Sequence, residues 1–438
     1  MAVKYDAVVV GAGVAGLSFA TRMAGYGYRV VVLESANPEH LGHDWWDTIE
    51  LRSFDVLGLA RPEPPEARTP FTFKMNVLGR TYPVVARMPD DMVNVERRLL
   101  ATRMVRWATQ ADVEIRFGCH VTGPILENGR CKGVTLATAG DHAARVKAPL
   151  TIDASGAAAV LRRRFDPAVA ARWGFETEIP PESFMHTWRG IATDTSVGGD
   201  SVICMGQGNS TSWISREPDG LVDIFAGSLG GSRGAEDPET VAMDMIARQG
   251  GIGDWVRPGT SAVIPLRRPF DGIVAPGFML LGDSACMANP INGSGMTVAI
   301  DAAIIAADTA HDAMMKGRFE ASDLWSYPRD FFRANAELAF LDALKSFVFS
   351  APRDPMLDFF RQGGLRGPAF WKMRPEFGPA GFAAKAGAFA RTKGAAALLP
   401  PMAGTLTRAA IAERHMALYP SSPSGFNQWK AIRRRITG

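Results

Sequence analysis

The feature that most constrains the fold is a glycine-rich turn between two valine-rich runs near the start of the chain. Residues 5–10 form a short apolar run, which predicts a buried parallel strand. Gly11-Ala12-Gly13-Val14-Ala15-Gly16 follows at once, residues 17–24 have helical spacing, and residues 28–33 predict a second strand that ends on Glu34. The order strand, G-x-G-x-x-G, helix, strand, acid is the fingerprint of a dinucleotide-binding unit.

Each part of this unit has a physical role in holding a dinucleotide. Gly11 allows a tight turn after the strand, Gly13 lets a pyrophosphate approach the backbone, and Gly16 lets the helix pack close to the strand. The start of the helix offers free N–H groups and a partial positive charge to the phosphates. Glu34 stands where a carboxylate can bind a ribose 2′-hydroxyl, which favours FAD or NAD over NADP. The predicted binding residues of this unit are Gly11, Gly13, Val14, Ala15, Gly16, Glu34 and Ser35.

The composition indicates a globular protein with more than one domain. The chain has 438 residues, of which 47% are hydrophobic and 21% charged, and its net charge of +3 is too small to indicate a nucleic-acid partner. Residues 430–435 are basic and could contact anionic lipid, although a solvated tail is the simpler interpretation.

A cytoplasmic location is predicted from what the sequence lacks. The first residues do not have the pattern of a signal peptide, and no apolar run reaches the about 18 residues of a membrane-spanning helix. The cysteines have no metal-binding spacing, so we expect free thiols in a reducing compartment and no metal site. They are Cys119, Cys131, Cys204 and Cys286.

Beyond the first unit, the pattern of the sequence changes twice. Residues 49–59 and 94–108 have helical patterns, and residues 71–85 predict a hairpin. Residues 180–270 lose the strand–helix alternation, which predicts an antiparallel sheet, and the segment after residue 320 is mostly helical.

A second glycine-rich stretch also lies between a short strand and a helix. The short apolar strand of residues 278–281 leads into Gly282-Asp283, and Pro290, Gly293 and Gly295 precede a long helix that begins at Met296. Asp283 at a strand end can accept hydrogen bonds from a ribityl hydroxyl. The two later glycines let the backbone approach a flat ring, and the start of the helix directs positive charge towards the edge of a flavin.

At these residues the chain resembles a known family, the FAD-dependent oxidoreductases in the branch that includes para-hydroxybenzoate hydroxylase. Pro265-Leu266-Arg267-Arg268-Pro269, Gly282-Asp283-Ser284-Ala285 and Asn289-Pro290-Ile291-Asn292-Gly293-Ser294-Gly295-Met296 are most similar to segments of the geranylgeranyl reductases. The resemblance implies FAD as cofactor and an α/β fold. The expected parts are a Rossmann-like FAD domain of the glutathione-reductase type, an antiparallel-sheet substrate domain and a helical C-terminal region. The expected boundaries are 1–66, 94–165 and 270–320 for the FAD domain, 67–93 and 166–269 for the substrate domain, and 321–438 for the C-terminal region.

The resemblance also implies individual residues. Arg97 matches an arginine that contacts FAD, Val121 a residue whose backbone meets the adenine, and Gly156 the glycine of a D-x-x-G segment beneath FAD. Trp213 alone remains from the family's Y-x-W-x-F-P motif of the substrate cavity. Gly42-His43-Asp44-Trp45-Trp46 replaces a Gly-Cys loop that is common near the flavin.

The leading functional hypothesis is reduction of carbon–carbon double bonds in an isoprenoid or other hydrophobic substrate by hydride transfer from reduced flavin. His43 and Asp44 are the predicted catalytic polar groups beside the ring, and a turn that caps the next helix is the alternative interpretation. Trp45, Trp46 and Trp213 either line the substrate pocket or pack in the core. NAD(P)H or a redox protein would donate the electrons, and a hydrophobic substrate would bring peripheral membrane contact.

Two other functions stay open from the sequence. A flavin-dependent monooxygenase or halogenase would act through a flavin hydroperoxide. However, Cys286 stands where many hydroxylases have histidine, and no W-x-W-x-I-P segment of the halogenases occurs. A flavin-binding protein without turnover is the third hypothesis, against which the two glycine-rich stretches argue.

Overall fold

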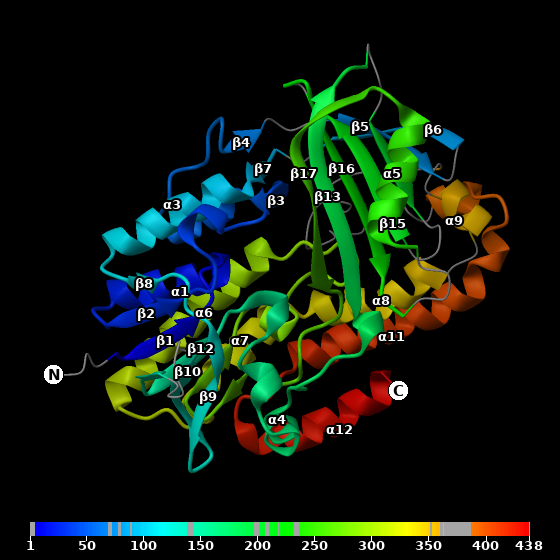
Figure 1. Ribbon diagram of the computed structural model, residues 1–438. Coiled ribbons are helices and arrows are strands. Elements are labelled where there is room, and N and C mark those ends of the chain that lie inside the picture. Colours follow the sequence, from blue (N-terminus) through cyan, green and yellow to red (C-terminus); the bar gives the residue numbers. More distant parts are fainter. Residues whose placement is uncertain are drawn as a thin grey trace.

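The computed structural model describes residues 5–68, 72–77, 80–87, 90–137, 144–196, 201–205, 210–217, 219–231, 236–350, 353–359, 362 and 387–437. Two large sheets stand next to each other, and C-terminal helices lie along one end of both (Figure 1). The turn of the predicted hairpin at residues 78–79 lies outside the described residues.

The first large sheet carries the fingerprint of the N-terminus. Its strand order is β18-β19-β12-β1-β2-β8, and all neighbours are parallel except β18 and β19. Val8, Val9, Val31 and Val32 are completely buried, because this sheet is covered on both faces. The strands are β1 (Ala7–Val10), β2 (Val30–Leu33), β8 (Glu114–Arg116), β12 (Leu150–Asp153), β18 (Val274–Ala275) and β19 (Phe278–Leu280).

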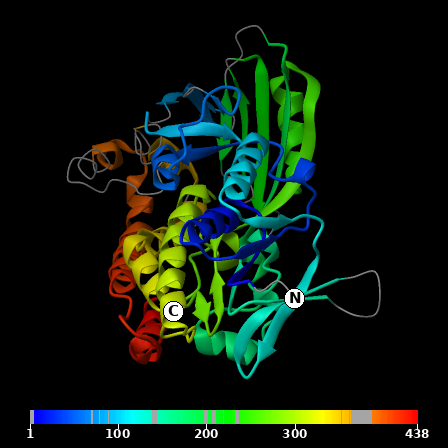
Figure 2. The same cartoon turned by 90° about the vertical axis from the view of Figure 1, so that its left-hand side faces the viewer.

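Three helices pack on or beside this sheet. They are α1 (Val14–Gly25), α3 (Arg97–Gln110) and α6 (Met296–Lys316). Helix α1 packs against both of the others, and Figure 2 shows α1 and α6 side by side. Ala302, Ala303, Ala306 and Ala310 are fully buried on α6, and their small side chains allow the close approach of the two helices.

The second large sheet has the order β17-β13-β16-β15-β14-β5-β6, and its strands are antiparallel except for the β14–β5 pair. Helix α5 (Pro238–Gln249) covers one face, where Ala242 and Met245 pack against Ile214 and Ile224. The opposite face is turned towards the first sheet. The strands are β5 (Thr72–Val77), β6 (Arg80–Arg87), β13 (Phe184–Asp194), β14 (Val202–Met205), β15 (Ser210–Arg216), β16 (Leu221–Leu229) and β17 (Ile252–Pro265).

Two three-stranded sheets complete the β-structure. One has the order β3-β7-β4 and the other the order β11-β10-β9. Their strands are β3 (Trp46–Glu50), β4 (Ala67–Arg68), β7 (Met92–Glu96), β9 (Val121–Glu127), β10 (Arg130–Leu136) and β11 (Ala144–Lys147).

The structure corrects two predicted helices. Residues 46–50 are strand β3 and helix α2 (Arg52–Leu57) begins only after it, whereas a helix was expected from residue 49. The expected helix at 94–108 likewise begins at Arg97, because residues 92–96 are strand β7. β3 and β7 pair with each other in an antiparallel ladder, and this distant pairing overrides the local helical pattern.

The C-terminal region is helical, as predicted, and it is attached through buried tyrosines. The Tyr327 hydroxyl donates a hydrogen bond to the carbonyl of Leu280 at 2.8 Å, and the Tyr419 hydroxyl donates to the carbonyl of Asp271 at 2.8 Å. The helices are α7 (Ser326–Ala334), α8 (Glu337–Ser350), α9 (Arg353–Phe359), α11 (Leu399–Ala417) and α12 (Phe426–Thr437), and the short α4 (Pro167–Trp173) lies near α12 (Figure 1).

The basic end of the chain is not a solvated tail. Lys430 is buried on α12 and its ammonium group donates to the carbonyl of Ala171 at 3.3 Å. Arg433 is ion-paired with the buried Asp271. None of the helices within the described ranges combines the length and the apolar character needed to cross a bilayer. The predicted fold class is confirmed, while the exact domain boundaries stay a prediction.

The carboxylate of Asp153 is expected to stabilise the segment that follows β12. Its Oδ1 accepts the N–H of Ser155 at 3.1 Å, and its Oδ2 accepts the N–H groups of Leu161 and Arg162 at 3.0 and 2.8 Å. In Asp153→Asn, the amide NH₂ faces the donors on one of these two sides. We therefore expect urea titrations to give a free energy of unfolding lower by roughly 2–4 kcal/mol. The control is Asp166→Asn at the exposed N-cap of α4, where Asn is an equally good cap and the change should stay within about 0.5 kcal/mol. Equal losses in both variants would contradict this role of Asp153.

Candidate cofactor and substrate site

The candidate site lies at the carboxyl ends of the parallel strands. Leu33, Val10, Asp153 and Leu280 are the last residues of four neighbouring strands, and they are aligned in register. The segments that follow these residues therefore leave the sheet at one edge. Ligands of such sheets bind at this edge.

The three glycines of the first loop have distinct surroundings. Gly11 has a φ of +104°, and a Cβ there would lie 2.3 Å from the carbonyl oxygen of Ala154. A Cβ on Gly16 would lie 2.1 Å from the carbonyl oxygen of Gly11, whereas a Cβ on Gly13 would have no atom within 4 Å. Gly11 and Gly16 are thus required by packing. Gly13 faces open space at the N-cap of α1, which leaves room for a phosphate.

Glu34 is fixed beside this loop. Its Oε2 accepts the N–H of Ala12 at 2.7 Å, and its Oε1 accepts the N–H of Ala36 at 2.8 Å and the hydroxyl of Ser35 at 3.2 Å. The N–H of Cys119 donates to the carbonyl of Glu34 at 2.8 Å, so the start of β9 at Val121 lies nearby. The structure therefore brings together the residues predicted for the adenosine end of the cofactor.

The second glycine-rich stretch packs against the first. A Cβ on Gly282 would lie 3.4 Å from the Cβ of Ala15, which places the turn of Gly282–Ala285 at the start of α1. Asp283 follows, and its carboxylate accepts no hydrogen bond from any described residue. Burial raises the pKa of Asp283, and the charge of Arg97 opposes this effect. An acceptor without a protein donor suits a hydroxyl-bearing ligand, so this position fits a ribityl chain.

The loop before α6 is held by Asn289, which the sequence analysis missed. Its Oδ1 accepts the N–H groups of Ile291 and Asn292 at 2.8 and 3.3 Å, and its carbonyl accepts the N–H of Gly293 at 3.0 Å. An asparagine that begins a turn before Pro290 is the signal that could have identified it. The predicted residues Pro290, Gly293, Gly295 and Met296 all lie on this loop or at the first turn of the helix.

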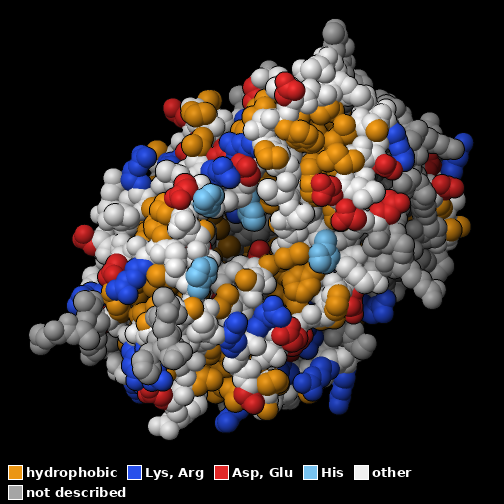
Figure 3. Space-filling view, viewed as in Figure 1, with side chains coloured by type: hydrophobic (Ala, Val, Ile, Leu, Met, Phe, Trp, Pro, Cys, Tyr) orange, Lys and Arg blue, Asp and Glu red, His pale blue; other side chains and the backbone are white. Residues whose placement is uncertain are grey.

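A hollow opens between the two large sheets. The space-filling view shows it near the middle of the face seen in Figure 1, with histidine side chains around it (Figure 3). His43 is exposed to solvent. Partial desolvation of its ring, and then the charge of Arg97, lower the pKa of His43 to about 4. The ring stacks on Trp45 with centroids 4.3 Å apart. The lowered pKa favours the neutral imidazole at pH 7, and a catalytic role of His43 stays a prediction.

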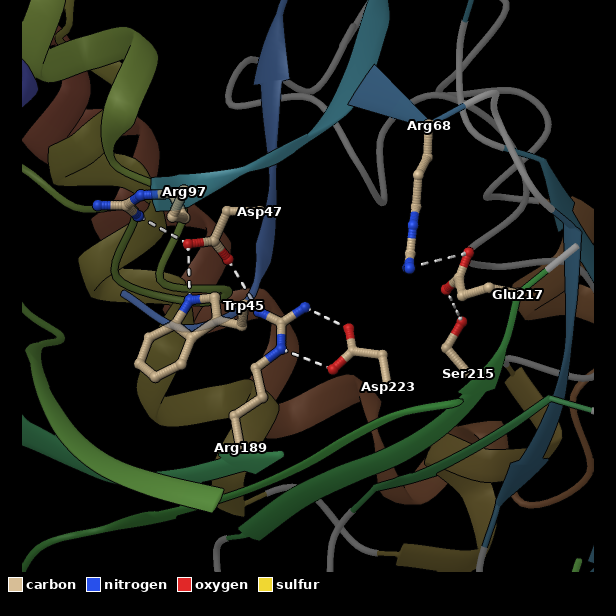
Figure 4. A network of polar contacts seen from close by, with 8 residues as sticks. All are labelled: Trp45, Asp47, Arg68, Arg97, Arg189, Ser215, Glu217 and Asp223. Atoms are coloured by element: carbon tan, nitrogen blue, oxygen red, sulfur yellow. Dashed lines mark hydrogen bonds and ion pairs between the residues drawn. The ribbon is translucent and has the colours of Figure 1, made fainter. Parts of the chain in front are cut away.

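Asp47 of strand β3 connects helix α3 with strand β13 of the second large sheet (Figure 4). Its Oδ2 lies 2.7 Å from Nη1 of Arg97 and accepts the indole N–H of Trp45 at 3.0 Å, while its Oδ1 lies 2.9 Å from Nη1 of Arg189. Arg189 in turn forms a two-point contact with Asp223. Burial alone would raise the pKa of Asp47, but Arg189 and Arg97 lower it below its ordinary value.

Asp44 does not accompany His43 as a free acid. Its Oδ1 lies 2.9 Å from Nη1 of Arg257, and its Oδ2 lies 3.3 Å from Nη2 of Arg98. The carboxylate connects β17 with the first turn of α3. Asp44 is therefore a partner in structural ion pairs, and its catalytic role stays a prediction.

Trp45 and Trp46 are buried in one cluster with Ile191, while Trp213 packs elsewhere, at the margin of another cluster. Arg189 lies 5.8 Å from the ring of Trp45 and 5.5 Å from the ring of Trp213, so these two flank the same cation. The ring of Trp46 instead packs against the guanidinium of Arg68, with 3.5 Å between Cζ and the ring centroid. Trp213 also stacks on Phe225 at 3.9 Å.

The charged strand residues of this site carry no motif, and the sequence analysis missed them. Arg189, Asp223 and Glu217 are all buried in or just beyond strands of the second sheet. Their signal is a single ionisable residue within an apolar run, such as the aspartate of Val222-Asp223-Ile224. A buried charge of this kind requires a partner, which the sequence does not identify.

Comparisons with known proteins agree on the class of the protein. A family model described as FAD dependent oxidoreductase matches residues 6–200, and one described as squalene epoxidase matches residues 269–341. Digeranylgeranylglycerophospholipid reductase 1 of Methanococcoides burtonii is 24% identical over 344 residues, which cover 74% of this chain and 79% of the relative. The digeranylgeranylglycerophospholipid reductase of Sulfolobus acidocaldarius is 24% identical over 375 residues, which cover 80% of this chain and 79% of the relative.

Solved structures confirm the fold. A geranylgeranyl bacteriochlorophyll reductase-like protein from Thermoplasma acidophilum has a TM-score of 0.75 at 15% identity, covering 92% of this chain and 99% of that chain. A flavin-dependent brominase has a TM-score of 0.61 at 16% identity, covering 92% and 98%. The matches together confirm the prediction of an FAD-dependent oxidoreductase with geranylgeranyl reductase-like relatives.

The surroundings of Gly13 and Gly16 predict opposite effects of the same substitution. Gly13→Ala meets no atom and keeps its φ of −74°, so stability in urea should change by less than about 0.5 kcal/mol. FAD affinity should fall about tenfold or more in fluorescence titrations of the apoprotein, because the methyl group occupies the space for the phosphate. Gly16→Ala should lower stability by roughly 1–3 kcal/mol through overpacking. Undiminished FAD binding by the Gly13 variant would refute the assigned position of the phosphate.

The raised pKa of Glu217 predicts that the free energy of unfolding depends on pH. Its Oε1 accepts the hydroxyl of Ser215 at 2.8 Å, and burial, then the charge of Asp223, raise its pKa from about 4.5 to about 7. Below pH 4.5 the carboxyl is neutral in both the folded and the unfolded chain. Between pH 4.5 and 7 it ionises in the unfolded chain and stays neutral in the folded one, so the folded protein loses stability over this range. Glu217→Gln should remove this loss, so it should exceed wild type by up to about 3 kcal/mol at pH 8 and match it near pH 4.

Urea unfolding at both pH values measures this difference. The control is Glu63→Gln on the surface, which should shift both values equally. A Glu217 variant whose advantage does not grow with pH would rule out the raised pKa.

Proposed function

We propose that this chain, an FAD-dependent oxidoreductase related to the digeranylgeranylglycerophospholipid reductases, reduces carbon–carbon double bonds in an isoprenoid or another hydrophobic substrate. The observation that carries the proposal is an apolar cluster placed directly against the glycine loop before α6. When bound, the reduced flavin supplies a hydride; the protein must bind the substrate, orient it and give access to a proton.

The residues for the cofactor follow from the positions described above. The N-terminus of α1 and Gly13 would take the pyrophosphate, and Glu34 the ribose hydroxyl. Asp283 would accept hydrogen bonds from the ribityl chain. The loop at residues 293–295 would lie along the flavin ring, with Arg97 near its edge.

The apolar cluster would hold the substrate. Met185, Phe225, Leu229 and Leu266 are buried together, and Trp213 and Ile264 pack at the margin of this cluster. A Cβ on Gly293 would lie 3.4 Å from Ile264, so the cluster adjoins the proposed position of the flavin ring. An apolar wall next to a polar cofactor cradle is typical of a site for a hydrophobic ligand. The names of the relatives, which act on isoprenoid lipids, support the same substrate class.

The proton in this proposal comes from water. Asp44 is held by two arginines, and His43 is neutral at pH 7 because its pKa is about 4. A neutral imidazole can hold a water molecule in the hollow through its N–H. Arg97 and Arg189 fix the position of Asp47, and this network keeps the wall of the hollow in place.

The proposal is tested by flavin reoxidation in the wild-type protein and in a Trp213 variant. The holoprotein is reduced with dithionite under argon and mixed with a geranylgeranyl alkene, and flavin absorbance is followed. We expect reoxidation with formation of the saturated product. Trp213→Ala should lower the second-order rate constant about tenfold or more, since loss of an apolar contact of this size costs about 1.5–3 kcal/mol. The control Trp255→Ala removes a 42% exposed indole that packs on Trp188, away from the cluster, and should leave the rate unchanged.

Two results would contradict the proposal. Failure of every isoprenoid alkene to reoxidise the flavin would exclude the reaction. Accumulation of an oxygenated flavin after admission of air would instead favour the monooxygenase or halogenase alternative. Replacement of dithionite by NADH or NADPH in the same assay tests a nicotinamide as the electron donor.

A further inference from the structure

A second cavity lies among the C-terminal helices, apart from the glycine loops. It has a volume of about 210 Å³ and lies between α8, α11 and α12, which run together at one end of the molecule (Figure 1). Its walls are alanine side chains together with Met416 and Ile436, and its polar groups include Arg268, Arg408 and Arg433. Nothing in the proposed reaction uses this cavity.

Positive charge exceeds negative charge in this cavity. Arg268 and Arg433 share the carboxylate of Asp271, with 3.1 Å between Arg268 Nη1 and Oδ1. Burial and then the charge of Arg268 lower the pKa of Arg433, as expected for two cations that compete for one anion. Arg408 forms no ion pair with a carboxylate of the described residues. Asp342 is the carboxylate in the wall, and Lys345 lies 3.8 Å from it.

The shape and charge of this cavity indicate an anionic ligand. Guanidinium groups that converge on a small volume match the oxygens of a phosphate, because they offer several donors in a fixed plane. The apolar remainder of the wall favours a phosphate that carries a hydrophobic group over a free inorganic ion.

Exposed apolar side chains flank the cavity. Ile411 is 48% exposed and directly precedes Ala412 of the wall, and Ile432 is 44% exposed one helical turn before Ile436. Both belong to helices that also expose Arg414 and Arg434. Helices that expose both large apolar side chains and arginines are typical of segments that lie at the interface of an anionic bilayer.

We propose that this cavity binds the phosphate group of an anionic lipid, and that Ile411 and Ile432 enter the lipid surface beside it. The helix pair that lines the cavity also supports the loop before α6. Phe340 of α8 and Ala409 of α11 belong to the cluster that packs against Ile291. A lipid bound here would thus hold the molecule at a membrane by the helices that support its cofactor loop.

The test measures binding of the holoprotein to vesicles by flotation. Vesicles of phosphatidylcholine alone are compared with vesicles that also contain phosphatidylglycerol, and we expect at least about tenfold tighter binding to the second kind. Arg408→Ala should weaken this binding about fivefold. The control Arg248→Ala removes an exposed arginine of α5 and should have no effect. Retained flavin absorbance shows that each variant is folded.

Inorganic phosphate distinguishes the two sources of the anion. Titration calorimetry with phosphate should show weak binding that Arg408→Ala abolishes and that the double change Ile411→Ser and Ile432→Ser preserves. The same double change should weaken vesicle binding about tenfold. Equal binding to both kinds of vesicle, or equal effects of the Arg408 and Arg248 changes, would overturn the proposal. Phosphate binding without vesicle binding would assign the cavity to a free phosphate and would refute the lipid.

Discussion

The close contact between the ends of β1 and β12 is the constraint on which the rest of the site depends. Gly11 and Ala154 approach so closely that a Cβ on Gly11 would lie 2.3 Å from a carbonyl oxygen. This contact turns the chain sharply into α1 and directs the N-terminus of the helix at the edge of the sheet. Because β19 is aligned with β12, the same edge receives Asp283. The Gly11–Ala154 contact and the pairing of β12 with β19 therefore bring both glycine-rich stretches to one edge.

A partly buried charge network then connects the second sheet with strand β3 and helix α3. Asp47 contacts Arg97 of α3 and Arg189 of β13, and Arg189 continues to Asp223 of β16. Burying ions is costly unless each is paired, and the removal of one partner leaves a charge without compensation. The network thus ties strand β3 and helix α3 to strands β13 and β16 of the second sheet. Because each ion needs its partner, such a network positions the residues around a binding site more strictly than apolar contacts do.

Sequence alone identified the parts of this structure that local physics determines. Gly11 and Gly16 were predictable because turn geometry and helix packing exclude a side chain, and the valine runs because a parallel sheet is covered on both faces. The last two residues of β3, 49–50, were assigned to a helix, since the pairing of β3 with β7 is distant in the sequence. Arg189 and Asp47 lie 142 residues apart, and no spacing rule connects them. The charge partners of His43 and Asp44 could likewise come only from the folded chain.

The electrostatic balance of the hollow bears on the class of substrate. Arg97 and Arg189 are compensated by Asp47 and Asp223, and His43 is neutral at pH 7 because its pKa is about 4. An entering molecule therefore meets no unpaired charge in this group, and a charged substrate would gain little there in return for losing its hydration. An apolar chain has no such hydration to lose, and it gains contact with the cluster of Trp213 and Phe225. The same arginines that fix the two sheets thus leave a neutral wall, which favours a hydrophobic substrate over a polar one.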